Sequence, residues 1–218
     1  MNFGPYDDEY YYVKKDRRLS PDDPDQKPVY IGAVPKDEWT DNNRTGYTNN
    51  PNQIMKFEPN ILETRIEQDH PGQIGDLNDA ISGFLVLPWV YDMLRFFPIR
   101  GVQWMHAVYY DIYDQIHEPM HFMKFYEMMD YWSRERSTLL FPYDEDNPDE
   151  RAEIDQLSLD ENKFSVIPED ERLAFMLGGT GFPDILFHAR IAEPLIEKEA
   201  KGVRFFKITK YEDGMEYQ

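Results

Sequence analysis

The chain contains two similar stretches, FLVLPWVYDMLRFFPIRGVQWMHAVYY at residues 84–110 and ILFHARIAEPLIEKEAKGVRFFKITKY at residues 185–211. When Gly101 is aligned with Gly202, apolar and aromatic residues coincide along both stretches. The coinciding pairs are Val90 with Ile191, Leu94 with Leu195, Val102 with Val203, Trp104 with Phe205 and Tyr110 with Tyr211. Each copy has the pattern of a short apolar strand, a helix, a glycine at the helix end and an alternating strand. No catalytic motif recurs with the repeat. The repeat therefore gives information on the fold and not on a catalytic site.

Within the first copy, apolar residues follow helical spacing between Asp76 and Phe97. They stand at positions 87, 90, 91, 94 and 97, and Pro88 would occupy the first turn, where a proline is tolerated. We therefore predict a helix in this region. After Gly101, apolar and polar side chains alternate from Val102 to Ile112, and their β-branched and aromatic character predicts a long strand.

Outside the repeat, the periodicity is weaker. Residues 1–80 are rich in Pro, Asn, Asp and Gly, and turn signals separate their short β-prone pieces. We expect strands at residues 10–13, 29–34, 154–159 and 172–177, and a strand or short helix at residues 54–66. The stretch 120–140, dense in aromatic residues and methionine, is compatible with helix or strand.

Length and composition limit the class of protein. At 218 residues the chain can bury an ordinary core, and we predict one α+β domain, residues 1–218, with helices on a twisted, largely antiparallel sheet. The absence of cysteine excludes disulfides and thiolate metal sites and fits a reducing compartment. We found no basic start followed by an apolar run, and no stretch of the roughly 20 apolar residues that span a bilayer. We therefore expect a soluble, cytoplasmic protein.

The formal net charge of -19 favours some partners over others. It opposes binding to nucleic acid or an anionic membrane and favours a basic partner, although solubility alone is an alternative explanation. The charge is also uneven. Residues 141–172 hold 12 acidic and 3 basic residues, whereas residues 173–218 hold 7 acidic and 6 basic residues and are almost neutral.

The segment His117-Glu118-Pro119-Met120-His121 matches the H-E-x-x-H pattern of zinc proteases. That pattern works because an α-helix places both imidazoles on one face, one turn apart, with the glutamate beside the metal-bound water. Pro119 opposes this interpretation, since a proline inside a helix removes a hydrogen bond and costs about 3 kcal/mol. A metal-dependent hydrolase using His117, Glu118 and His121 is an alternative hypothesis, beside two ordinary histidines in a turn.

Residues 142–153 predict an acidic loop, because two prolines and adjacent carboxylates oppose both helix and strand. An EF-hand calcium loop needs glycine at its sixth position and glutamate at its twelfth, where this chain has Asp149 and Asp155. We therefore interpret the loop as a solvated run of charge or as a surface that docks a protein. Residues 178–181, GGTG, lack the Lys-Ser/Thr pair of a phosphate loop and predict a turn.

Four segments resemble a known family. They are ISGFLVLPWVYDMLRFFPIRGVQWMHAV (81–108), MDYWSRERSTLLF (129–141), IDQLSLDENKFSVIPEDERLAFMLGG (154–179) and DILFHARIAEPLIEKEAKGVRFFKI (184–208). Together they resemble the bacterial immunity-protein family numbered eleven in polymorphic toxin systems, formerly a domain of unknown function. The resemblance covers residues 76–211 and leaves residues 1–75 unmatched. This chain departs from the family in Leu87 and His188, which replace a helix-capping serine, and in Pro194, for which we expect a late or bent second helix.

The resemblance implies a non-enzymatic inhibitor that binds and neutralises a cognate toxin, with no catalytic residues and no cofactor. Combined with the charge, it suggests that an acidic surface covers the basic active site of the toxin, for which a nuclease is one candidate. The contact residues that we expect are Asp144, Glu145, Asp146, Asp149 and Glu150.

Overall fold

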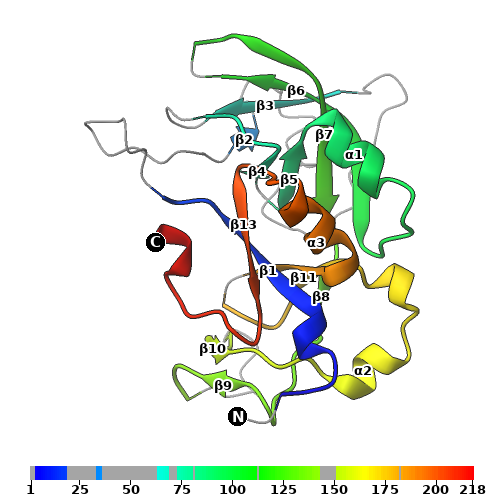
Figure 1. Cartoon of the computed structure of the whole chain (residues 1–218), viewed down its shortest axis with the longest axis vertical. Helices are drawn as coiled ribbons and strands as arrows, with labels where there is room; N and C mark the ends of the chain where they lie inside the picture. The colour runs from blue at the N-terminus through cyan, green and yellow to red at the C-terminus, as the bar shows by residue number, and fades with distance from the viewer. Residues whose placement is uncertain are drawn as a thin grey trace.

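A computed structural model describes residues 3–18, 33–35, 63–68, 73–80, 82–111, 113–142, 151–181 and 183–218. Over these residues the protein is α+β, with helices packed on twisted, mostly antiparallel sheets (Figure 1). The predicted fold class is confirmed. The strands nevertheless form two main sheets and a small third one, where the sequence suggested a single sheet.

The first main sheet has five strands in the order β13–β1–β12–β11–β8. Its strands are β1 (Tyr10–Lys15), β8 (Met128–Met129), β11 (Ala174–Leu177), β12 (Ile185–His188) and β13 (Val203–Lys207). β1 is antiparallel to both neighbours, because Tyr12 pairs with Leu186 on one side and with Phe206 on the other. The N-terminal strand therefore lies between two strands from the end of the chain.

The second main sheet curls until its first and last strands meet, in the order β2–β3–β6–β7–β5–β4. Its strands are β2 (Ala33–Pro35), β3 (Glu63–Gln68), β4 (Leu77–Ala80), β5 (Gly83–Val86), β6 (Val102–Tyr110) and β7 (Ile116–Phe125). β6 and β7 form a long hairpin whose register shifts between Ala107 and Tyr109. The third sheet is a short antiparallel pair, β9 (Thr138–Leu139) and β10 (Ile154–Gln156).

The two repeated stretches fold alike, as the sequence predicts. The first contains β5, α1 (Pro88–Leu94) and β6, and the second contains β12, α3 (Ala189–Glu197) and β13. In each unit both strands flank one antiparallel strand, which is β7 in the first unit and β1 in the second. The glycine before the last strand has a positive φ in both, 74° at Gly101 and 97° at Gly202.

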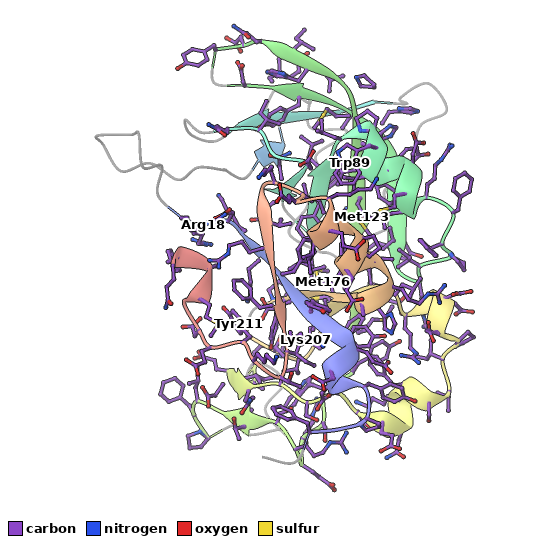
Figure 2. All side chains as sticks on the ribbon, viewed as in Figure 1. Arg18, Trp89, Met123, Met176, Lys207 and Tyr211 are labelled. Atoms are coloured by element: carbon purple, nitrogen blue, oxygen red, sulfur yellow. The ribbon has the colours of Figure 1, made fainter. Side chains whose placement is uncertain are left out.

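One apolar core joins both main sheets and the helices α1 and α3. Val90 of α1 and Ile191 of α3 are almost fully buried in it. Met123 and Met176 enter the same core from the two different sheets, and Trp89 packs against its edge (Figure 2). A second cluster covers the other face of the five-stranded sheet, and a third lies within the curled sheet. The repeated units are therefore held together by a shared interior.

Some sequence expectations were wrong in their boundaries. The helix predicted between Asp76 and Phe97 spans only Pro88–Leu94, because the residues before it form β4 and β5. α3 does not start late, since it begins at Ala189 and contains Pro194. The stretch 120–140, for which the sequence was compatible with helix or strand, is mainly strand and turn. The short helix α2 (Glu161–Ser165) was not predicted. Among the described residues, no helix has the length and apolar character needed to cross a membrane.

Candidate functional site

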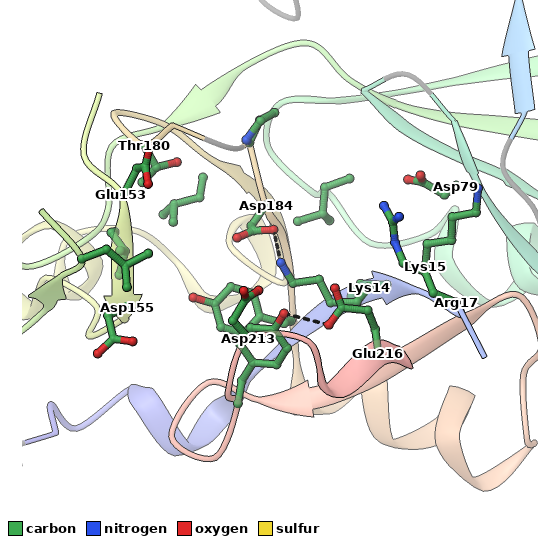
Figure 3. A pocket seen from close by; sticks show the side chains of 18 of the residues that line it. Lys14, Lys15, Arg17, Asp79, Glu153, Asp155, Thr180, Asp184, Asp213 and Glu216 are labelled. Atoms are coloured by element: carbon green, nitrogen blue, oxygen red, sulfur yellow. Dashed lines mark hydrogen bonds and ion pairs between the residues drawn. The ribbon is translucent and has the colours of Figure 1, made fainter. Parts of the chain in front are cut away.

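A groove of about 540 Å³ opens where the C-terminal segment, the start of β12 and the β9–β10 pair approach β1 (Figure 3). Its walls combine tyrosine rings, aliphatic side chains and charged groups. Among the described residues, the charged lining consists of six carboxylates, from Asp79, Glu153, Asp155, Asp184, Asp213 and Glu216, and three cationic side chains, from Lys14, Lys15 and Arg17. Negative groups therefore outnumber positive ones by two to one.

Lys14 lies at the centre of the groove. Its ammonium group donates a hydrogen bond to Asp184 Oδ1 at 2.5 Å, and lies 4.9 Å and 5.0 Å from the ring centroids of Tyr12 and Tyr211. Because residues two apart in a strand share a face, β1 directs Tyr12 and Lys14 to the same side. Ion pairing and cation–π attraction both stabilise an ammonium in these surroundings. The groove is thus chemically suited to cationic groups, and it already holds one of the protein's own.

The two tyrosines beside Lys14 stay neutral at physiological pH. Burial raises the pKa of Tyr12 well above its ordinary value, and the charge of Asp184 adds to the effect. Burial also raises the pKa of Tyr211, whose hydroxyl donates a hydrogen bond to Glu216 Oε2 at 3.0 Å. The negative charge of the groove therefore comes from its carboxylates. Of these, Glu153, Asp155 and Asp213 are the solvent-exposed ones.

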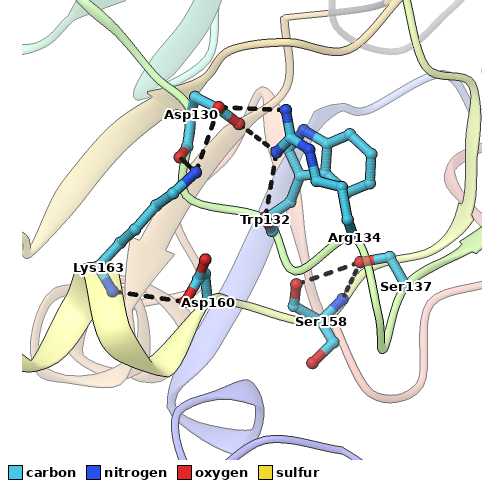
Figure 4. A network of polar contacts seen from close by, with 7 residues as sticks. All are labelled: Asp130, Trp132, Arg134, Ser137, Ser158, Asp160 and Lys163. Carbon is cyan, nitrogen blue, oxygen red and sulfur yellow. Dashed lines mark hydrogen bonds and ion pairs between the residues drawn. The ribbon is translucent and has the colours of Figure 1, made fainter. Parts of the chain in front are cut away.

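A polar network braces the chain that leads into the β9–β10 wall (Figure 4). The Asp130 carboxylate accepts hydrogen bonds from Arg134 and from Lys163 Nζ, the latter at 3.2 Å. The Arg134 guanidinium also lies 3.8 Å from the centroid of the Trp132 ring. These contacts fasten the segment between β8 and β9 to the helix α2, which fixes one wall of the groove.

Two serines and a buried aspartate hold the same wall from its other side. Ser158 N donates to Ser137 Oγ at 3.0 Å, and Ser137 Oγ donates to Ser158 O at 3.2 Å (Figure 4). Asp7, which is fully buried, accepts hydrogen bonds from Ser158 Oγ at 2.7 Å and from Leu159 N at 2.8 Å. The aspartate and serines of residues 129–141, which carry part of the family resemblance, therefore support the groove wall.

The acidic residues predicted to contact a partner lie outside the described residues. They are Asp144, Glu145, Asp146, Asp149 and Glu150, and they belong to the connection between β9 and β10. Of the described residues that follow this connection in the sequence, Glu153 and Asp155 line the groove on or beside β10. Sequence reasoning missed the opposite wall, because Lys14 and Asp184 are separated by 170 residues.

The His-Glu-Pro-Met-His motif lies in β7 and not in a helix. Residues four apart in a strand are about 13 Å apart, too far for the one-turn arrangement that a zinc protease uses. His117 Nε2 lies 3.1 Å from Asp111 Oδ2, and the His121 ring stacks on Tyr91 of α1 with centroids 3.8 Å apart. The predicted conflict between Pro119 and a helix is confirmed. Within the described part of the chain, no three His, Asp or Glu side chains gather as metal ligands would.

Residues 178–181 form a packed turn. Gly181 N donates to Ala152 O at 2.8 Å, and Thr180 contributes to the groove. A Cβ atom at Gly179 would lie 3.2 Å from Trp132 Nε1 and 3.3 Å from Asp130 Oδ1, so a carboxylate faces the turn. This position disfavours an anion and supports the interpretation as a turn.

The arrangement as a whole combines an acidic groove, aromatic faces and a braced wall. No protein-family model matches the chain, and no curated protein matches it in sequence. The resemblance to the immunity-protein family is therefore an interpretation of the quoted residue pattern. What the groove can do follows from its own chemistry, which is to accept lysine or arginine side chains from another molecule.

Proposed function

We propose that the protein is an immunity protein, made in the cytoplasm of a bacterium to bind a secreted toxin and cover the toxin's active site. The observation that supports this most is the acidic groove, together with the acidic bias of residues 141–172 in the sequence. Such a surface attracts a basic partner protein and repels nucleic acid and anionic membranes. The family resemblance over residues 76–211 supports the same function.

The mechanism is occlusion without bond breaking. The net charge of -19 steers a basic toxin domain toward the groove. Exposed carboxylates at Glu153, Asp155 and Asp213 then pair with lysines or arginines around the toxin's active site. If the toxin is a nuclease, its cleft is basic because its substrate is anionic, and a row of carboxylates occupies the place of the phosphates.

The first toxin candidate to test is the variable C-terminal domain of a large secreted protein encoded in an adjacent reading frame. Co-expression of the full chain should restore growth to cells that make this domain, and the purified pair should bind. The double variant Glu153→Gln, Asp155→Asn should weaken binding about tenfold and flatten its dependence on salt, since two rim charges are lost. Calorimetry at two or more salt concentrations measures both quantities.

A matched control is Glu161→Gln with Glu197→Gln, which removes the same charge from exposed positions on α2 and α3, outside the groove lining. This control should bind within about twofold of the natural chain, because it changes only the long-range electrostatic attraction to the toxin.

A third variant replaces Asp144, Glu145, Asp146, Asp149 and Glu150 by their amides and should also weaken binding. Equal losses in the groove variant and the control would mean that net charge, and not the groove, governs binding. A chain that neither binds nor protects would refute the proposed function.

A further inference from the structure

The β6–β7 hairpin carries a second feature, at its tip, which we define as Asp111 and residues 113–117. The β6–β7 hairpin reaches the upper end of the molecule, whereas β9, β10 and the C-terminal segment, which contribute to the groove, lie in its lower part (Figure 1). β3 pairs with β6 up to Tyr110, whereas β5 pairs with β7 only from His121 onward. Among the described strands, residues 116–120 of β7 therefore pair with β6 alone. Within the described part of this sheet, the tip end of β7 is an edge, and Pro119 removes a backbone donor there, which limits the pairing of that edge with other strands.

The tip is held in one shape by a single carboxylate. Asp111 Oδ1 accepts hydrogen bonds from Tyr113 N at 2.8 Å and Gln115 N at 2.9 Å, while Oδ2 lies 3.1 Å from His117 Nε2. The backbone closes the same turn, since Asp111 N donates to Gln115 O at 3.0 Å. Desolvation acts to raise the pKa of Asp111, but the hydrogen bonds from His117 and the two amides lower it overall.

This fixed turn presents two large apolar side chains to solvent. Tyr113 is 76% exposed and Ile116 is 55% exposed. Single exposed apolar residues are common on proteins, but here two stand within four residues on a turn whose hydrogen bonds do not involve their side chains. Rigid presentation lowers the entropy lost on binding, and tyrosine is enriched among the residues that dominate binding energy.

The charge of the tip identifies its partner. The tip contains two carboxylates, from Asp111 and Asp114, and no lysine or arginine. We propose that this tip inserts Tyr113 and Ile116 into an apolar pocket with a basic rim on the same toxin domain, as a second contact beside the groove. The proposal rests on the proposed function, because it takes the toxin as its partner. The two contacts then have different roles. The groove carboxylates attract the toxin and speed association, and the tip provides desolvated contact area that slows dissociation.

The test compares Tyr113→Ala and Ile116→Ala with Phe96→Ala and Val166→Ala, which remove apolar side chains that are at least as exposed, 77% and 78%, from other loops. Each tip variant should weaken toxin binding at least about tenfold, as hot-spot residues do, while each control stays within about twofold. The tip variants should keep the natural salt dependence, because they remove no charge.

Asp111→Ala provides a second measurement. Loss of three hydrogen bonds should speed hydrogen exchange at the amides of Tyr113 and Gln115 in the free protein and weaken binding several-fold. Tip variants that bind like the natural chain, while the groove variant is weakened, would overturn the inference and leave the proposed function standing. Failure of the natural chain to bind the toxin at all would overturn both. Circular dichroism confirms that each variant is folded.

Discussion

The two strand–helix–strand units share a plan but obtain their middle strand differently. In the first unit, β7 follows β6 through a short turn, so residues 83–125 supply all parts. In the second unit the middle strand is β1, which comes from the opposite end of the chain. Local contacts form with less loss of chain entropy than distant ones. The first unit is thus a local structure, whereas the second ties the two ends of the described chain together.

The helix starts of the two units also differ. Leu87 and His188 have nearly the same backbone angles, with φ of -69° and -67° and ψ of 156° and 151°. His188 Nδ1 accepts a hydrogen bond from Arg190 N at 3.1 Å and caps α3, whereas Leu87 offers no side-chain cap. In α1, Pro88 at the first helical position needs no partner for a backbone N–H. One backbone geometry is therefore stabilised by two chemical solutions.

The largest expected difference between the units is at their glycines. A Cβ at Gly202 would lie 1.9 Å from Leu77 O, a backbone atom that cannot move aside without disturbing β4. A Cβ at Gly101 would lie 3.1 Å from side-chain atoms of Glu127 and Met129 and at an ordinary 3.7 Å from the Glu127 backbone oxygen. Gly202→Ala should therefore cost roughly 3–5 kcal/mol, from left-handed strain plus overpacking, and Gly101→Ala about 1–2 kcal/mol from strain. Urea unfolding of both variants measures this. If both variants lose the same free energy of unfolding, the close approach of Gly202 to β4 does not contribute to the cost of the substitution.

Much of this fold follows from local sequence. The Gly-Val pairs and the spacing of Leu94 and Leu195 were sufficient to predict both helices and the strands after them, because helix and strand periodicity is set by immediate neighbours. The division into two sheets was not predictable, since it depends on β1 pairing with strands more than 170 residues away. β5 corresponds to the short apolar strand expected at the start of the first copy, whereas β4 was not predicted, because its sequence Leu-Asn-Asp-Ala has neither an apolar run nor a strict alternation.

The second prediction concerns Asp76, whose carboxylate joins the two units through hydrogen bonds. Asp76 Oδ1 accepts a hydrogen bond from Trp89 Nε1 of α1, and Oδ2 accepts one from Lys201 N before β13, both at 2.8 Å. Asp76→Ala should lower the free energy of unfolding by about 2 kcal/mol, because two hydrogen bonds to a charged group are lost. The matched control Asp92→Ala, at an exposed position of α1 that pairs with Arg95, should change stability by less than about 0.5 kcal/mol. A loss no larger than the control's would show that the units do not depend on this link.

The candidate site was less predictable than the fold. The acidic bias of residues 141–172 can be counted along the sequence, and this stretch includes Glu153 and Asp155, which line the groove. Lys14, Tyr12 and Asp184 carried no such signal, since a cation between tyrosine rings is created only when β1 enters the sheet beside β12. The His117-Glu118-Pro119-Met120-His121 motif matched by letters alone, and the proline inside it was the better guide to its conformation.

The smallest expected effect is the pH dependence of the α3 cap. His188 is 6% exposed, and its Nε2 lies 3.4 Å from Glu9 Oε2 while Nδ1 accepts from the helix. Burial lowers the pKa of His188 below 6.5, although Glu9 and Glu169 oppose the shift and Arg172 adds to it. The unfolded chain therefore takes up a proton at higher pH than the folded chain. Stability from this group is complete above about pH 6.5 and declines as the pH falls below it.

His188→Asn separates this effect from the cap itself, because an asparagine oxygen can accept the same hydrogen bond without titrating near neutrality. The natural chain should lose more stability between pH 7.5 and pH 5.5 than His188→Asn does, and the two should be similar at pH 7.5. His121, whose pKa is lowered by burial and by His106, titrates in both proteins and cancels from the difference. His188→Ala should lose about 1 kcal/mol at pH 7.5, because it removes the cap. A parallel pH profile in the asparagine variant would mean that the second unit gains nothing from a neutral imidazole, and that its helix start is as independent of pH as that of the first.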